Sequence, residues 1–236
     1  MQNHAAAIKE DTSITEYKEQ APWEPELFKI NFTILPASKE ACTAQQLRLA
    51  AQEAIRKTTA TNEYFTDGSV DLSIPSATAG VHSTTLKGGW KLSDNASTLK
   101  TELIAIAKAL EDSQHRKGNT IIHTDSKGAI QAITNEKAKE NIRLLSSIRA
   151  IASLLQSRNR QITLNWIPSH VGIQGNEEAD SLTKSGLLHS NISIKITRLH
   201  TQLKNKAVAH CQLQKKAKLE ELFSVAQKPP DGTWTP

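Results

Sequence analysis

Residues 63–70 read Glu-Tyr-Phe-Thr-Asp-Gly-Ser-Val, and residues 119–126 read Asn-Thr-Ile-Ile-His-Thr-Asp-Ser. Both stretches have the short apolar run of a buried strand, and each run ends in an aspartate, Asp67 or Asp125. We expect the two strands to lie parallel and adjacent, because right-handed crossovers place such strands side by side. Adjacent parallel strands end at the same edge of a sheet, so the two aspartates should be neighbours in space.

The segments around these strands complete an α/β pattern. The predicted strands are 63–70, 77–85, 86–92, 119–124 and 161–167. The predicted helices are 97–116, 126–134, 144–157 and 176–188. Three strands in series favour an antiparallel meander, and the later strands alternate with helices. This order predicts a mixed five-stranded sheet in the order 3-2-1-4-5, flanked by helices.

The two ends of the chain differ from this central block. Residues 1–60 contain proline-spaced sequence, one candidate strand at 28–32 and a helix at 38–57 that Ser38 would cap. We interpret them as an N-terminal connector segment. Residues 61–190 form the predicted main domain, and residues 191–236 a basic, helical C-terminal tail.

The composition excludes several classes of protein. No apolar run approaches the roughly 20 residues that span a bilayer, and the polar N-terminus lacks the apolar core of a secretory signal. Cys42 and Cys211 lack the spacing of a disulfide framework or a zinc site. We therefore expect an intracellular protein, cytoplasmic or nuclear, without a membrane partner.

Basic residues concentrate near the C-terminus. Residues 184–218 contain eight lysines and arginines and no acid, in a chain of net charge +5. Such a segment can neutralise phosphates and attract nucleic acid, but it can equally be a solvated helix face.

Two further acids are placed to join the aspartates. Glu102 lies beside the apolar face of its helix, and Asp180 lies near the start of the last helix. Four gathered carboxylates would repel one another unless cations filled the gap, and Mg²⁺ with oxygen ligands is the natural solution. Individually, Asp67 could be a turn former and Asp125 a helix cap, so the argument depends on their convergence.

A loop motif lies between the last strand and the last helix. It runs Trp166-Ile-Pro-Ser-His170-Val-Gly and continues to Gly175-Asn176-Glu-Glu-Ala-Asp180. We expect a mobile loop with His170 at its base. Imidazole titrates near neutral pH, so His170 could pass a proton to a leaving oxygen; a lone histidine is more often structural.

Together these phrases resemble the type 1 ribonuclease H family, and within it the domains carried by non-LTR retrotransposons. The matching phrases are Tyr64-Phe-Thr-Asp67-Gly-Ser69, Lys100-Thr-Glu102-Leu103, Ile122-His-Thr-Asp125-Ser126 and the loop motif just quoted. The resemblance covers about residues 61–190. It implies a ribonuclease H-like fold. It also implies that the protein is a hydrolase, namely an endonuclease that cuts the RNA strand of RNA–DNA hybrids with two Mg²⁺ or Mn²⁺ ions.

The resemblance also implies roles for individual residues. The metal ligands would be Asp67, Glu102, Asp125 and Asp180. His170 would take the loop position and Asn176 a polar substrate contact. Backbone amides and hydroxyls at Gly68, Ser69 and Ser126 are further candidate substrate contacts, with turn and capping roles as the alternative.

The chain departs from cellular members of this family. The interval between Asp125 and His170 lacks the basic, tryptophan-rich extension found in many of them, so the hybrid would be gripped elsewhere, with Lys87, Lys127 or the C-terminal helix as candidates. Residues 1–60 resemble the connector after a reverse transcriptase, so the chain would be fused to, or derived from, such a polyprotein. The alternative function is a catalytically silent nucleic-acid-binding module from a retroelement.

Overall fold

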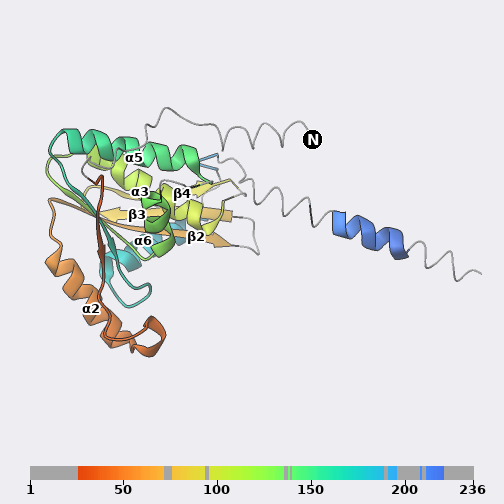
Figure 1. The fold of residues 1–236 in the computed structure, drawn as a ribbon, viewed down its shortest axis with the longest axis horizontal. Helices are drawn as coiled ribbons and strands as arrows, with labels where there is room; N and C mark the ends of the chain where they lie inside the picture. Colours follow the sequence, from red (N-terminus) through yellow and green to blue (C-terminus); the bar gives the residue numbers. More distant parts are fainter. Residues whose placement is uncertain are drawn as a thin grey trace, which may run out of the picture.

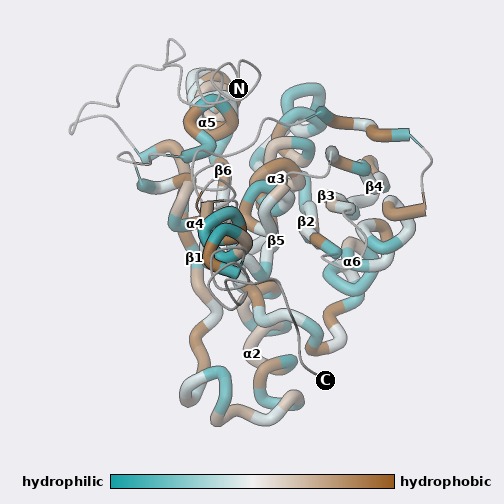
Figure 2. Tube along the Cα trace, turned by 90° about the vertical axis from the view of Figure 1, so that its right-hand side faces the viewer, coloured by the Kyte–Doolittle hydropathy of each residue, from teal (hydrophilic) through white to brown (hydrophobic). Residues whose placement is uncertain are grey.

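The computed structural model describes residues 26–71, 76–93, 96–135, 138, 140–188, 191–195, 208 and 211–220. Within these residues the strands are β1 (Lys29–Phe32), β2 (Asn62–Asp71), β3 (Ser76–Ser83), β4 (Lys87–Leu92), β5 (Thr120–Thr124) and β6 (Ile162–Trp166). They form one sheet in the order β1-β6-β5-β2-β3-β4 (Figure 2). Strands β1, β6, β5 and β2 run parallel, whereas β2, β3 and β4 form the antiparallel meander.

The predicted order 3-2-1-4-5 is confirmed for the five strands that the sequence indicated, but the predicted number of strands is wrong. The described part of the sheet has a sixth strand, β1, which is the candidate strand at 28–32. It pairs with β6 from Lys29 opposite Thr163 to Phe32 opposite Trp166. Pairing at this edge satisfies backbone groups of β6 that would otherwise face solvent. Residues 29–32 are therefore part of the sheet.

The helices lie on both faces of the sheet (Figures 1 and 2). They are η1 (Lys39–Ala41), α2 (Ala44–Lys57), α3 (Thr98–Gln114), α4 (Lys127–Thr134), α5 (Ile142–Ser157) and α6 (Gln174–Gly186). Helices α3, α4 and α5 cover one face, and α3 packs against both of the others. Helices α6 and α2 lie on the opposite face, where both contribute to an apolar cluster around Phe65.

The predicted cap of the first helix is wrong. Ser38 precedes only the short 3₁₀ turn η1, and its side chain makes no capping hydrogen bond. Helix α2 begins after Thr43, whose hydroxyl accepts from the amide of Gln46 while the Gln46 side chain accepts from the amide of Thr43. This reciprocal capping box satisfies two free amides, which a serine five residues earlier could not reach.

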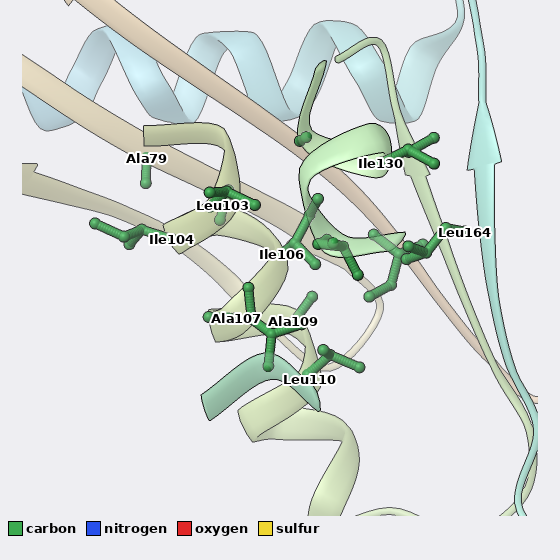
Figure 3. Packing of buried hydrophobic residues seen from close by; sticks show 14 of the residues in the cluster. Ala79, Leu103, Ile104, Ile106, Ala107, Ala109, Leu110, Ile130 and Leu164 are labelled. Atoms are coloured by element: carbon green, nitrogen blue, oxygen red, sulfur yellow. The ribbon is translucent and has the colours of Figure 1, made fainter. Parts of the chain in front are cut away.

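The larger core lies between the sheet and α3. Helix α3 is buried along most of its length and packs chiefly against β2, β3 and α5, with Ile130 of α4 and Leu164 of β6 in the same apolar cluster (Figure 3). Leu103, Ile106 and Leu110 recur at helical spacing and are fully buried, as are Ile122 and Leu164 on the strands. This packing fixes the start of α3 near the point where the pairing of β2 with β5 ends.

The C-terminal prediction is tested only in part. Residues 211–220 are helical and every one of them is exposed. Of the rest of the predicted tail, residues 196–207, 209–210 and 221–236 lie outside the described residues, as does the whole stretch 1–25. No helix in the described ranges is long and apolar enough to cross a membrane.

Candidate active site

Two aspartates follow a pair of residues that lie opposite each other in the sheet. In the parallel pair β2–β5, Thr66 lies opposite Thr124, and Asp67 and Asp125 are the next residues. Asp67 is buried and Asp125 is partly buried. The two aspartates therefore lie side by side where the β2–β5 pairing ends, as parallel pairing predicts, although β2 itself continues beyond Asp67 to Asp71.

Helix α3 brings a third carboxylate to this edge. The helix begins where the Ser97 hydroxyl accepts a 3.2 Å hydrogen bond from the amide of Lys100, and Glu102 follows in the next turn. Glu102 is only 5% exposed. Carboxylate oxygens of Asp67, Glu102 and Asp125, one from each, all lie within 4.8 Å of one another.

The three carboxyl groups disfavour simultaneous ionisation. Burial, followed by the charge of Asp67, raises the pKa of Asp125 to about 6. Burial, followed by the charges of Asp125 and Asp67, raises the pKa of Glu102 well above its usual value. The pKa of Asp67 is also raised, chiefly by burial, with a further contribution from Asp180. A nearby cation would remove this penalty, because it stabilises the charged form of every carboxylate.

One oxygen of this cluster lacks a hydrogen bond. Within the described residues, Glu102 Oε2 is buried and has no hydrogen-bond partner. An orphaned buried acceptor is costly, and here it belongs to a carboxylate beside two others. Hard divalent cations prefer such oxygen ligands, so the residues present fit a metal of this class.

The fourth acid, Asp180, is close to the cluster but is not gathered into it. It lies on α6 and groups with His170 and Glu177, with ligand atoms within 4.8 Å of one another. Its Oδ2 accepts a 2.5 Å hydrogen bond from Lys184 Nζ, one turn later on the same helix. Asp180 is nevertheless near enough to Asp67 for its charge to raise that pKa. The structure thus brings three of the four acids together and holds the fourth beside them.

Glu177 is a residue that the sequence argument missed. It lies three residues before Asp180 in α6, a spacing that places both on one helix face. Its Oε1 accepts a 3.2 Å hydrogen bond from the amide of Gly172, so it also ties the preceding loop to the helix. The i, i+3 pairing of acids after a histidine was the available signal.

His170 lies on the loop between β6 and α6. It is exposed and has a left-handed backbone conformation, with φ +54°. The residues around it are anchored: Val171 and Ile173 are buried in the cluster that includes Leu47 and Ala51 of α2. Helix α2 therefore supports the base of the loop while the imidazole stays accessible.

The predicted substrate contacts occupy varied positions. Gly68 lies against the backbone of α3, and Ser69 pairs with Thr78 in the meander. The Ser126 hydroxyl caps α4 by accepting from the amide of Ala129. Asn176 is almost fully buried, and its Oδ1 has no hydrogen-bond partner among the described residues. A role of Gly68, Ser69, Ser126 and Asn176 in substrate binding stays a prediction.

Two of the lysines proposed to grip a substrate already have local contacts. Lys87 Nζ lies 3.8 Å from a carboxylate oxygen of Glu178. Lys127 Nζ lies 4.0 Å from the centre of a Trp166 ring. Both lysines are exposed, so their charges remain accessible to a ligand.

The acids and the loop described above lie in the part of the chain that matches a known protein family. The family model described as RNase H matches residues 59–188, more than half of the 236-residue chain. The match begins just before β2 and ends just after α6, so it contains the acids and the loop and leaves out β1 and α2. The chain belongs to the RNase H family.

Proposed function

We propose that this chain is a metal-dependent endonuclease that hydrolyses the RNA strand of RNA–DNA hybrids. The observation that carries the proposal is the buried cluster of Asp67, Glu102 and Asp125, with its raised pKa values and the orphaned Glu102 Oε2. Membership of the RNase H family supports ribonuclease activity in general. The cluster supports the finer statement, because it is a site suited to divalent cations.

The metal ligands would be Asp67, Glu102, Asp125 and Asp180. Two Mg²⁺ ions are the proposed cofactor, with Mn²⁺ as the substitute. Bound there, they would lower the pKa of the attacking water and stabilise the attacking and leaving oxygens of an in-line displacement. Asp67 groups with Glu102 and Asp125 and is also near enough to Asp180 for that charge to raise its pKa, which suits Asp67 to be the shared ligand.

Two residues outside the cluster would assist the reaction: Lys184, which pairs with Asp180, and His170, which would donate a proton. Lys184 holds Asp180 in an ion pair, and release of that pair would free the carboxylate for the site. His170, exposed on its loop, would pass a proton to the leaving 3′-oxygen. The products would carry a 5′-phosphate and a 3′-hydroxyl.

The substrate would be recognised by shape. An A-like duplex displays 2′-hydroxyls across a wide minor groove and hides its base edges, so sequence preference should be weak. Gly68, Ser69, Ser126 and Asn176 are the proposed contacts near the cut. Fusion to a reverse transcriptase polyprotein, or descent from one, is the proposed context of the chain.

The test is cleavage of one labelled sequence presented as an RNA–DNA hybrid, duplex RNA, single-stranded RNA and duplex DNA. With Mg²⁺ the hybrid alone should lose its RNA strand, and EDTA should stop the reaction. Binding of the hybrid without cleavage, with either Mg²⁺ or Mn²⁺, would replace the proposal by the catalytically silent binding module.

A further inference from the structure

A pocket near the acidic cluster is built partly from residues that precede the family match. It has a volume of about 320 Å³ and is lined by Phe32, Ser38, Lys39, Lys127 and Trp166, among others. The first three precede residue 59, where the family match begins, and the other two lie within it. Strand β1 and the turn after it therefore build a feature that the matched domain alone would lack.

One lining residue of this pocket, Trp166, is hydrogen-bonded to a residue of the acidic cluster. Trp166 Nε1 donates a 3.0 Å hydrogen bond to the backbone carbonyl of Asp125. Burial and Asp67 raise the pKa of Asp125, and the charge of Lys39 is among the smaller effects that lower it. The pocket is thus linked to the cluster by one hydrogen bond and by the charge of Lys39.

Two lysines are held at the pocket by separate contacts. Lys127 Nζ lies 4.0 Å above a Trp166 ring, a cation–π contact that orients the ammonium group. Lys39 Nζ donates a 2.9 Å hydrogen bond to the hydroxyl of Ser169, the residue before His170. Among the described residues that line the pocket none is acidic and two are lysines, so these residues carry a net positive charge.

The aromatic wall strengthens attraction to an anion. Phe32 is 44% exposed, although it lies in the sheet, and its ring centre lies 6.5 Å from that of Trp166. An apolar wall beside two ammonium groups lowers the local dielectric constant and so strengthens their attraction to an anion. A basic group next to an exposed aromatic ring, here Phe32, is typical of surfaces that follow a nucleic-acid strand, whereas Trp166 is only 3% exposed.

We propose that this pocket binds a backbone phosphate of the strand that is cut, close to the scissile phosphate. This inference rests on the proposed function and extends it to a substrate-binding site supplied by residues 32–39. Along one strand, successive phosphates are about 3.4 Å apart in axial rise. Trp166 lines the pocket and hydrogen-bonds to Asp125, so we assign the pocket to the strand that is cut at the acidic cluster.

The first experiment measures binding without cleavage. Anisotropy of a labelled RNA–DNA hybrid in EDTA is recorded over a series of NaCl concentrations for Lys39→Ala, Lys127→Ala and the double variant. Because both lysines face one phosphate, loss of that contact in the double variant should lower the slope of log K against log salt by about 1, and each single variant should lower it by less. Lys39→Arg and Lys127→Arg should keep the wild-type slope.

The matched control is Lys117→Ala. Lys117 is also exposed, but it precedes β5, at the opposite end of that strand from Asp125. Its slope should equal that of the wild type. Slopes for Lys39→Ala and Lys127→Ala that also equal the wild-type value would overturn the pocket.

A second experiment tests the choice of strand. A single neutral methylphosphonate is moved along the RNA strand or the DNA strand. The wild type should lose affinity at one RNA position near the cut, and the Lys39→Ala/Lys127→Ala protein should not respond there. A response confined to the DNA strand would overturn the strand assignment. Both experiments measure binding in EDTA, so their results do not depend on cleavage. Failure to cleave the hybrid would contradict only the proposed activity.

Discussion

Gly68 and Glu102 lie backbone against backbone. A Cβ atom added to Gly68 would stand 2.5 Å from the amide nitrogen of Glu102 and 2.5 Å from the hydroxyl oxygen of Thr101. The residue after Asp67 therefore allows α3 to approach β2 closely. This contact sets the position of the Glu102 carboxylate relative to that of Asp67.

Gly68→Ala should push α3 away from β2 and reduce activity. Because the nearest atoms include helix backbone, the clash cannot be relieved by a side-chain rotation, and we expect a loss of about 1–3 kcal/mol in unfolding free energy. Hybrid cleavage should fall by at least tenfold. Thermal unfolding and a cleavage assay measure the two effects.

The control for this substitution is Gly128→Ala. Gly128 lies in α4, where a Cβ atom would meet only Leu99 Cδ1 at 3.8 Å, an ordinary contact. Alanine should leave activity unchanged there and keep or raise stability. Equal behaviour of the two variants would contradict the role given to the Gly68–Glu102 contact.

Removing one acid should stabilise the metal-free protein. The folded-state pKa of Asp125 is raised to about 6, so at pH 7.5 its ionisation opposes folding. Asp125→Asn should therefore melt at the same or a higher temperature than the wild type in EDTA. Addition of Mg²⁺ should raise the melting temperature of the wild type by several degrees, because tenfold excess over Kd is worth about 1.4 kcal/mol. The variant should show a much smaller increase.

The two proteins are compared by differential scanning calorimetry in EDTA and in Mg²⁺. An equal Mg²⁺ effect on both would show that the ion binds elsewhere. A large drop in the melting temperature of Asp125→Asn in EDTA would contradict the electrostatic account of the cluster.

Asp112 should contribute to stability above about pH 4. Burial raises its pKa, but hydrogen bonds from Arg116, Tyr64 and Thr85 outweigh this effect, so the folded-state pKa lies below its usual value. Stability from such a group is complete above the unfolded-state pKa and is lost as the pH falls through the folded-state pKa.

The corresponding substitution is Asp112→Asn. It should lower the unfolding free energy at pH 7 by about 1–3 kcal/mol, because the Tyr64 hydroxyl loses a charged partner. It should also lose less stability than the wild type between pH 5 and pH 2. Urea unfolding at each pH, with Glu111→Gln as an exposed control on the same helix, measures this. Parallel pH profiles for Asp112→Asn and the wild type would refute the claim.

A buried polar chain should hold β1 to the rest of the sheet. Asn31 Nδ2 donates to Asn165 Oδ1 at 2.6 Å, Asn165 Nδ2 lies 2.8 Å from His123 Nδ1, and His123 Nε2 lies 2.9 Å from Glu63 Oε1. Because Asn165 donates, His123 Nδ1 accepts and Nε2 carries the proton. This series of hydrogen bonds crosses all four parallel strands.

Asn165→Ala should cost about 1–3 kcal/mol of unfolding free energy, because it orphans the fully buried His123 Nδ1. Asn31→Ala should cost less, since Asn31 is only partly buried and ends the chain of contacts. Urea unfolding of both variants tests the order. A larger effect of Asn31→Ala than of Asn165→Ala would be inconsistent with this network.

Much of the fold could be predicted from the sequence. The strands with Asp67 and Asp125 are apolar runs of sufficient length, and the handedness of crossovers limits how they can pair. Strand β1 was harder, because its four residues are exposed or partly buried and show no apolar run. Its place in the sheet depends on pairing with β6, more than 130 residues away in the chain.

The candidate site shows the same division. The convergence of Asp67, Glu102 and Asp125 follows from strand order and from the position of α3. The separate grouping of Asp180 does not, because it depends on which neighbour its side chain contacts. The Lys184 partner, at i+4, was readable from the spacing. The pocket at Phe32 was not, since it requires β1 to lie beside β6.

The most direct test of the central claim is the rate of hybrid cleavage in Mg²⁺ by the wild type, Asp67→Asn and Glu111→Gln. Asp67→Asn removes a proposed metal ligand with almost no change in volume, whereas Glu111 is exposed on α3 and pairs only with Lys108 among the contacts described. We expect loss of cleavage for Asp67→Asn, with its fold intact, and an unchanged rate for Glu111→Gln. Cleavage by Asp67→Asn at the wild-type rate would rule out Asp67 as a metal ligand.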